Sequence, residues 1–433
     1  MDYIERAIAG KIISRFKQKR VIAITGARQT GKTTLCKNII PKAVDRAFKY
    51  YTFDDPDERI RFKNSAIRIL ENVKEPIIIL DEVQKIPEIF DPLKYLIDKE
   101  GQNKKFIITG SSQILLIKGI KETLAGRVSL FNLYPLSFSE VSRKSAKTFF
   151  LNKLIGQQRI LKKDIEEINL ISSEELRDIL NKRDRLLKWG GYPPIWNIGG
   201  DDKNIEKTDW LKDYRKTYLE RDVPDVGSFT NPEAFILAQK LLTLRTGQIL
   251  SISEIAKEAG IAVNTVKRYI YILRATFISF LLNPYFNNTS KRLIKSPKIY
   301  FPDNGLNRVI AGEDGVSKGA LYETWIFSEL LKWKELQDIE PEIYFYKSAS
   351  GLEVDFIVKT ESFLLPIEVK SAQKVGYADG RSIDSFIKEY KLPLGIIVYP
   401  GNEIIEIRKN IFAVPDWFLF SSGKIRRNRR SLT

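Results

Sequence analysis

The stretch VIAITGARQTGKTT, residues Val21–Thr34, decides the fold of the N-terminal part of the chain. Its first five residues are apolar or β-branched, which is typical of a buried parallel strand. The strand leads into G-x-x-x-x-G-K-[ST], which spans Gly26 to Thr33. This order of strand, glycine-rich loop and helix predicts a loop that wraps phosphate groups with its backbone N–H groups.

Each polar position of this loop has an expected role toward a nucleoside triphosphate. Lys32 is expected to reach the β- and γ-phosphates, and the Thr33 hydroxyl to bind Mg²⁺. Gly31 opens a helix whose N-terminus faces the anion. The residues expected to hold ATP here are Gly26, Ala27, Arg28, Gln29, Thr30, Gly31, Lys32, Thr33 and Thr34.

A second motif follows at PIIIL, residues 76–80, which runs directly into Asp81 and Glu82. An apolar strand that ends in an acid downstream of such a loop is the Walker B pattern. We expect Asp81 to hold the Mg²⁺ shell and Glu82 to polarise the attacking water. The second acid favours ATP hydrolysis over a switch-type GTPase.

Two further segments complete the predicted ATPase site. The strand KFIIT, residues 105–109, ends in Gly-Ser-Ser, so Thr109 or Ser111 is expected to sense the γ-phosphate; the alternative is an ordinary turn. Arg127 in LAGRV follows at the position of an arginine finger that reaches a neighbouring subunit's nucleotide. If Arg127 acts in this way, the active form is a homo-oligomer.

Composition limits the chemistry. The 433 residues contain no histidine and one cysteine, Cys36, which excludes a disulfide within the chain and multi-cysteine or histidine-based zinc sites. Carboxylates with Mg²⁺ remain. The net charge of +17 favours nucleic acid, DNA above all, as a partner. We expect a cytoplasmic protein without a membrane partner, because the sequence contains neither a signal segment nor a long apolar run.

The middle of the chain is predicted to be mostly helical. Residues 141–230 are expected to form a helical connecting region, and residues 231–290 a winged helix-turn-helix. In the latter, Ser251 and Glu254 predict a capping box, Gly260 a helix end, and Asn264 the cap of a second helix. Basic residues of the second helix would contact a DNA backbone; the alternative is that the unit only packs against the ATPase domain.

Acidic residues on apolar strands mark the C-terminal domain, predicted at residues 291–420. Asp355 lies in LEVDFIV, and Glu368 and Lys370 share one face of IEVK. A hairpin between the two strands would place Asp355 beside Glu368 as ligands of Mg²⁺ or Mn²⁺, with Glu323 completing the site from a helix. Lys370 would orient a water or stabilise charge on a scissile phosphate. The alternative is a buried charge network without turnover.

These residues resemble the predicted archaeal and bacterial ATPases that join an AAA-like domain of the AAA_14 type to a DUF4143 domain of the PD-(D/E)xK nuclease-like kind. The matching stretches run in order from GARQTGKTT through IIILDEVQKIPE, TYLERD and PKIYFPDNGL to EVDFIV and IEVK. The resemblance implies an α/β chain with a RecA/AAA-like parallel-sheet ATPase domain (1–140), a winged-helix middle and a restriction-endonuclease-like C-terminal domain. A basic tail, residues 421–433, follows.

Two functions follow from these expectations. The first is an ATP-binding and ATP-hydrolysing DNA-processing protein with a metal-dependent C-terminal nuclease. The second is an ATP-dependent DNA-binding switch whose nuclease-like domain is inactive. A third, an ATPase that acts on a membrane surface or remodels proteins, lacks an amphipathic anchor and ranks lowest.

Overall fold

The structure is a computed structural model, and it describes most of the chain. The described residues are 3–99, 104–111, 120, 124–142, 149–200, 202–217, 231–286 and 295–421. The basic stretch Lys424–Arg430, expected to be a flexible arm, lies outside them.

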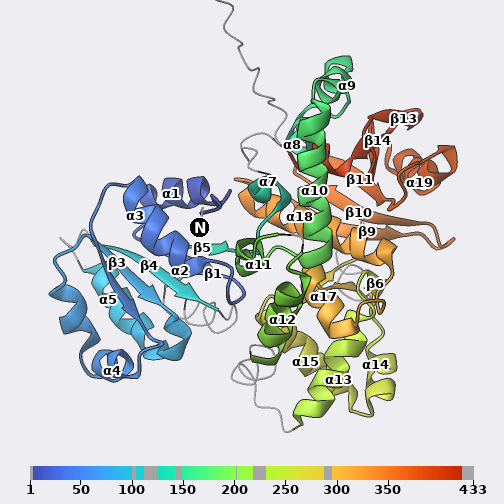
Figure 1. Ribbon diagram of the computed structural model, residues 1–433. Helices are drawn as coiled ribbons and strands as arrows, with labels where there is room; N and C mark the ends of the chain where they lie inside the picture. The colour runs from blue at the N-terminus through green and yellow to red at the C-terminus, as the bar shows by residue number, and fades with distance from the viewer. Residues whose placement is uncertain are drawn as a thin grey trace, which may run out of the picture.

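A five-stranded parallel sheet forms the N-terminal domain, in the strand order β2-β3-β4-β1-β5 (Figure 1). The predicted parallel-sheet domain is therefore confirmed. The strands are β1 (Val21–Thr25), β2 (Phe48–Thr52), β3 (Ile77–Asp81), β4 (Lys105–Gly110) and β5 (Val128–Asn132).

Alternate residues of the central strands bury both faces of this sheet. One face packs on α4 (Pro56–Glu71) and α5 (Phe90–Asp98), and the other on α1 (Ala9–Gln18) and the helical turns after the glycine loop. Those turns are α2 (Lys32–Thr34), a π-helical turn (Leu35–Ile39) and α3 (Ile40–Ala43).

The middle of the chain is helical, as the composition of that region predicts. Helix α7 contacts the long helix α10, and α13 to α15 pack together beside a small antiparallel sheet of order β6-β8-β7. The helices are α7 (Phe138–Val141), α8 (Phe150–Gln157), α9 (Lys162–Asn169), α10 (Ser173–Trp189), α11 (Pro193–Asn197), α12 (Asn204–Tyr214), α13 (Pro232–Thr243), α14 (Ile252–Ala259) and α15 (Val263–Ala275). The strands are β6 (Gln248–Ile249), β7 (Phe280–Leu282) and β8 (Lys298–Tyr300).

Two local predictions in this region are wrong. Ser251 precedes α14, but its side chain makes no cap hydrogen bond to the helix, so the capping box is absent. The second helix begins at Val263 after Ala262, two residues earlier than a cap at Asn264 requires. The end of α14 at Gly260 is confirmed, with φ at 64°. The winged-helix assignment itself stays a prediction.

A six-stranded mixed sheet of order β13-β14-β12-β11-β10-β9 forms the C-terminal domain. The antiparallel hairpin of β10 and β11 is confirmed, with Val358 opposite Leu365. The strands are β9 (Glu342–Lys347), β10 (Glu353–Lys359), β11 (Leu364–Val369), β12 (Gly395–Tyr399), β13 (Ile405–Arg408) and β14 (Ile411–Pro415). The helices are α17 (Asn304–Ala311), α18 (Lys318–Leu336), α19 (Arg381–Tyr390) and α20 (Asp416–Leu419).

Helix α18 links the C-terminal sheet to the ATPase sheet. Near its end, Glu335 accepts hydrogen bonds from Asn132, the last residue of β5. Lys11 of α1 donates to the backbone carbonyls of Glu335 and Gln337. The N-terminal domain is therefore hydrogen-bonded to the helix that also carries Glu323. We call Glu323, Glu353, Asp355 and Glu368 the C-terminal acid cluster.

Candidate functional site

The glycine loop lies at the carboxyl end of β1, where α/β sheets bind ligands. A side chain at Gly26 is excluded, because a Cβ there would lie 2.2 Å from the carbonyl oxygen of Leu133. Gly31 has φ at 92°, a conformation that glycine adopts without strain. These two positions explain why the loop needs glycine at both ends.

Lys32 is buried and turned back into the loop. Its Nζ donates hydrogen bonds of 2.9 Å each to the carbonyl oxygens of Gly26 and Ala27. Burial lowers the pKa of Lys32, an effect that the carboxylates of Glu82 and Asp81 partly offset. The ammonium thus lies at the loop, in reach of an anion that the loop would wrap.

Asp81 is the point where three hydroxyl groups meet. Thr33 Oγ1 donates to Oδ2 of Asp81 at 2.8 Å, and the Tyr50 hydroxyl donates to the same oxygen at 2.7 Å. Thr109 Oγ1 donates to Oδ1. A carboxylate and a threonine hydroxyl in contact are hard oxygen ligands, so this donor set fits Mg²⁺.

Glu82 follows in a left-handed conformation, with φ at 58°. Its Oε2 accepts hydrogen bonds from Ser111 Oγ at 2.9 Å and from the Gln84 amide, and its backbone N donates to Thr109 Oγ1 at 3.3 Å. Both γ-phosphate sensor candidates, Thr109 and Ser111, therefore contact the acidic pair at the ends of adjacent strands.

Arg127 lies away from the glycine loop of its own chain. It precedes β5, whose first residue Val128 pairs with Val21 at the amino end of β1. The loop follows the other end of that strand, about 17 Å away along five residues. Arg127 instead pairs with Asp98 through contacts of 2.6 and 3.0 Å on the surface. A role at a nucleotide would have to be in another copy of the chain.

A cavity of about 640 Å³ opens beside Gly31. Arg6 forms part of its wall and donates to the carbonyl oxygen of Thr30 at 2.6 Å and to Glu140 at 3.0 Å. Three of its apolar lining residues come from distant parts of the chain: Ile4, Ile39 and Pro193. Its lining also contains Tyr3, Thr34, Asn38, Lys42, Leu136 and Asn197.

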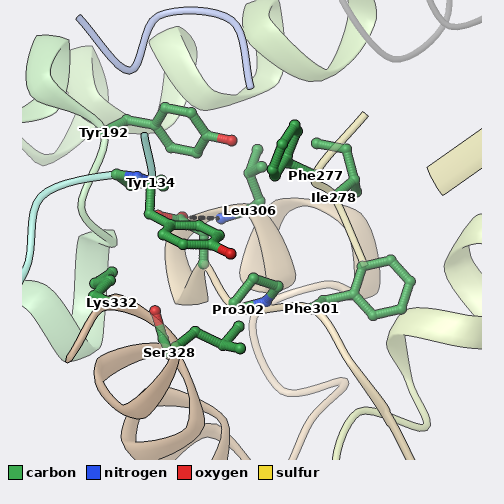
Figure 2. A pocket seen from close by; sticks show the side chains of 12 residues that line it. Tyr134, Tyr192, Phe277, Ile278, Phe301, Pro302, Leu306, Ser328 and Lys332 are labelled. Atoms are coloured by element: carbon green, nitrogen blue, oxygen red, sulfur yellow. Dashed lines mark hydrogen bonds between the residues drawn. The ribbon is translucent and has the colours of Figure 1, made fainter. Parts of the chain in front are cut away.

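A second, much smaller cavity of about 20 Å³ lies where the segment after β5, the middle region and α18 meet (Figure 2). Tyr134, Tyr192 and Phe301 line it, and Lys332 and Ser328 approach from α18. Its volume is that of about one water molecule. The place is therefore a packed junction and too small for a nucleotide.

The C-terminal acid cluster contains a lysine that the sequence analysis missed. Nζ of Lys298, on β8, lies 2.6 Å from Glu353, 3.2 Å from Glu323 and 3.8 Å from Asp355. Burial alone would lower the pKa of Lys298, but Glu323, Asp355 and Glu353 together raise it. The Tyr300 hydroxyl also donates to Glu323 at 2.5 Å.

Glu323 extends from α18 toward Asp355, as expected, but it already has two other partners. It pairs with Lys298 and Tyr300, and within the described ranges no group of three or more histidine, cysteine or acidic side chains is arranged to hold a metal ion. Asp355 and Glu368 remain as a pair on the β10–β11 hairpin. The predicted winged helix-turn-helix ends at residue 290, and β8 lies after this boundary. β8 nevertheless pairs with β6 and β7, which lie before it.

Glu368 is buried and Asp355 is half-buried, and the hydrogen-bonding capacity of both carboxylates is only partly satisfied. Asp355 Oδ2 accepts from the backbone N of Val369 at 2.8 Å, and Lys370 donates to Glu368 Oε1 at 2.9 Å. Oε2 of Glu368 is buried without a hydrogen-bond partner. Burial raises the pKa of both carboxyls, and repulsion between Asp355 and Glu368 adds to the shift of Asp355.

Three contributors lacked a signal in the sequence. Tyr50 has no motif, Arg6 lies far along the chain from the loop that it contacts, and Lys298 belongs to a different sheet from its acidic partners. A lone lysine in PKIYF could have drawn attention, because a charge in an apolar strand needs a partner.

Three family models match successive parts of the chain. Residues 18–142 match the AAA domain, residues 180–316 a domain of unknown function (DUF8612), and residues 318–419 a domain of unknown function (DUF4143). In chain order, a region similar to the AAA domain is thus followed by regions similar to DUF8612 and DUF4143.

Two similar proteins carry no functional name. The uncharacterized protein Rv2008c of Mycobacterium tuberculosis is 26% identical over 427 residues, covering 97% of this chain and 85% of its own length. The uncharacterized protein MJ1544 of Methanocaldococcus jannaschii is 29% identical over 380 residues, covering 84% of this chain and 78% of its own. The sequence similarity thus extends along most of this chain and most of both relatives.

Solved structures overlap only weakly. The replication initiator DnaA bound to AMPPCP and single-stranded DNA is 17% identical and covers 62% of this chain and 86% of that chain, with a TM-score of 0.25. The Thermotoga maritima RuvB Holliday junction branch migration motor is 13% identical. The match covers 64% of this chain and 89% of that chain, with a TM-score of 0.27. With these TM-scores, the similarity in structure to both proteins is weak. Across the described segments, no helix has both the length and the apolar character that spanning a bilayer requires.

Proposed function

We propose that the N-terminal domain binds Mg²⁺-ATP at the glycine loop and hydrolyses it. One observation carries this proposal: Thr33, at the start of the helix after the loop, donates a hydrogen bond of 2.8 Å to Asp81 at the carboxyl end of β3. The loop amides and Lys32 would hold the phosphates, and Thr33 and Asp81 would hold the metal. Bound Mg²⁺ would supply charge neutralisation on the phosphate oxygens.

The cavity beside Gly31 is the proposed place for the base and ribose. It continues from the loop, and its apolar wall between Ile4, Ile39 and Pro193 suits a planar ring. Because Pro193 belongs to α11, ATP in this place would contact the middle region as well as the loop.

Glu82 is the proposed general base. Its carboxylate is held by Ser111 and Gln84, so it is oriented from the tip of β4 and from its own loop. Thr109 contacts Asp81 and the backbone of Glu82, and would sense the γ-phosphate through them.

Lys32→Ala is expected to lose binding of fluorescent ATP. Glu82→Gln is expected to keep binding while hydrolysis falls about 100-fold or more. Equal hydrolysis by Glu82→Gln and the parent protein would refute this assignment.

Arg127 is the proposed arginine finger, acting on the nucleotide of a neighbouring subunit. This role requires that the active protein is a homo-oligomer. Its exposed position opposite the loop leaves it accessible to a neighbouring copy, once the contact with Asp98 opens. Mixing Arg127→Ala with Lys32→Ala protein tests this: inactive parents would form some active interfaces together. Full ATPase activity of Arg127→Ala alone would contradict the assignment.

For the whole chain we propose ATP-dependent DNA processing, with metal-dependent cleavage by the C-terminal domain. The buried, unpartnered Oε2 of Glu368 beside Asp355 supports a Mg²⁺ or Mn²⁺ site, because an orphaned buried carboxylate oxygen calls for a cation. Lys370, held by Glu368, would lie beside the scissile phosphate. The +17 net charge supports a DNA partner.

The second candidate is a DNA-binding switch in which this domain does not cleave. Lys298 supports this candidate, because its ammonium already neutralises Glu323 and Glu353. In a metal-dependent nuclease, such acids would be free to bind the metal ion. Plasmid and single-stranded DNA with Mg²⁺ or Mn²⁺ separate the two. Cleavage that Asp355→Ala and Lys370→Ala both abolish supports the nuclease. ATP-dependent binding without cleavage in any metal supports the switch.

A further inference from the structure

A groove of about 650 Å³ runs along the outer edge of the ATPase sheet, between β2 and α4. It is separate from the glycine-loop cavity, with which it shares no lining residue. We propose that this edge groove binds the phosphodiester backbone of a nucleic acid strand. The inference rests on the proposed DNA partner and assigns that partner a site on the ATPase domain.

The charge of the edge groove carries the proposal. Lys49, Arg61, Arg68 and Lys74 line it, against one acidic lining residue, Glu75. The four basic residues are all exposed. Arg61 also contacts Glu58 at 3.3 Å, but Glu58 is not part of the lining. A groove with this excess of cations fits a polyanion and repels a second copy of the same edge.

The other lining groups suit phosphate oxygens. Asn64, Ser65 and Asn72 add amide and hydroxyl donors, and α4 is broken at Ser65, where φ is −149° and ψ is 29°. β2 is an edge strand, so among the described strands its outer side has no pairing partner. Its backbone N–H groups on that side add donors that contact phosphates without reading sequence.

The simpler explanation is that lysines guard an exposed strand edge against pairing. That explanation accounts for Lys49 on β2 itself. It does not account for Arg68 and Lys74, which belong to α4 and to the segment after it. The only aromatic lining residue, Tyr51, is 7% exposed and packs on Phe62, so bases have no stacking surface there. The expected contact is therefore with the backbone and independent of sequence.

Binding of labelled single strands and duplexes of about 30 nucleotides, measured by fluorescence anisotropy without ATP, tests the proposal. The variant is Arg68→Gln with Lys74→Gln. The matched control is Lys162→Gln with Lys163→Gln on α9, at the far end of the molecule from α4 (Figure 1). The groove variant is expected to bind about tenfold more weakly between about 50 and 200 mM salt, and to reduce the salt slope by about 2.

Two outcomes would overturn the proposal. The control should bind like the parent protein; a loss equal to that of the groove variant would mean diffuse attraction by net charge and would overturn the proposal. Unchanged affinity and slope in the groove variant would also overturn it. A stronger effect on single strands or on duplexes would identify which form supplies the backbone. Binding of fluorescent ATP, measured on the same samples, reports separately on the glycine loop.

Discussion

The Tyr50 hydroxyl and the Asp81 carboxylate meet across neighbouring strands, with a hydrogen bond of 2.7 Å to Oδ2. Thr33 contacts the same oxygen. Tyr50 therefore fixes the orientation of the acid that is the proposed Mg²⁺ ligand, although it belongs to no nucleotide-binding motif. Nζ of Lys37 lies over the Tyr50 ring, 4.2 Å from its centre, and this contact helps to fix the ring.

Tyr50→Phe is expected to weaken Mg²⁺-dependent ATP binding about tenfold, because loss of a partner of a metal ligand typically costs 10- to 100-fold. In EDTA, binding of ATP should differ little from that of the parent protein. Titration with fluorescent ATP in both conditions measures the difference. Tyr95→Phe, an exposed tyrosine at 50%, is the matched control. An equal loss with and without Mg²⁺ would show that Tyr50 only supports the fold.

Lys298→Met is expected to destabilise the C-terminal domain by about 3–5 kcal/mol, because it leaves three half-buried carboxylates without their buried counter-charge. Lys298 is 3% exposed in its side chain, whereas Lys347, which also contacts Glu353, is 46% exposed. Lys347→Met is therefore the control, with an expected cost of about 1 kcal/mol or less. Thermal unfolding in EDTA measures both.

Mn²⁺ is expected to restore more stability to Lys298→Met than to the parent protein, since the freed acids then have a cation to bind. Differential scanning calorimetry with and without MnCl₂ measures this difference. A Lys298→Met protein as stable as its parent in EDTA would mean that the lysine is not the counter-charge of this cluster.

Glu335→Ala is expected to cost about 1–3 kcal/mol, because it removes two hydrogen bonds that the Glu335 carboxylate accepts from Asn132. Glu335 accepts from the backbone N of Asn132 at 2.9 Å and from its side-chain amide at 3.0 Å. The loss should also expose the α18 contact with β5 to protease. Urea unfolding and limited proteolysis measure the two effects. Glu340→Ala, with a side chain 53% exposed, is the control and should change neither.

The local motifs predicted the ATPase domain because its site is built from continuous stretches. Strand, loop and helix at Val21–Thr34 are adjacent in sequence, and Asp81 and Glu82 follow a strand directly. The parallel sheet then brings the ends of its strands to one edge, so Thr33 meets Asp81. The β10–β11 hairpin was predictable for the same reason, from two apolar runs and a short turn.

Contacts between distant elements were not predictable from the same patterns. Lys298 reaches Glu323 and Asp355 from a strand of another sheet, and its burial follows from tertiary packing that no local period records. The cap predicted at Asn264 failed because Asn is only one of several residues that suit that position, and Ala262 in an extended conformation begins the helix instead.

Asp416 predicts a pH dependence of stability. It is fully buried, and burial raises its pKa from 3.8 to about 6, although Arg183 and the Tyr322 hydroxyl, at 2.7 Å, act in the opposite direction. A carboxyl whose pKa is higher in the folded than in the unfolded protein binds more protons when folded. Its protonation therefore stabilises the fold at low pH, and this contribution is lost as the pH rises through about 6.

Asp416→Asn removes this titration, so the stability of the parent protein relative to the variant is expected to fall by about 2 kcal/mol between about pH 4.5 and about pH 7.5. Comparison of the two proteins cancels the titrations that they share. Calorimetric unfolding at several pH values measures the difference, with Asp178→Asn, whose side chain is 61% exposed, as the control. A constant difference across this range would mean that Asp416 stays ionised in the folded protein, with Arg183 as an effective ion-pair partner despite the 3.6 Å separation.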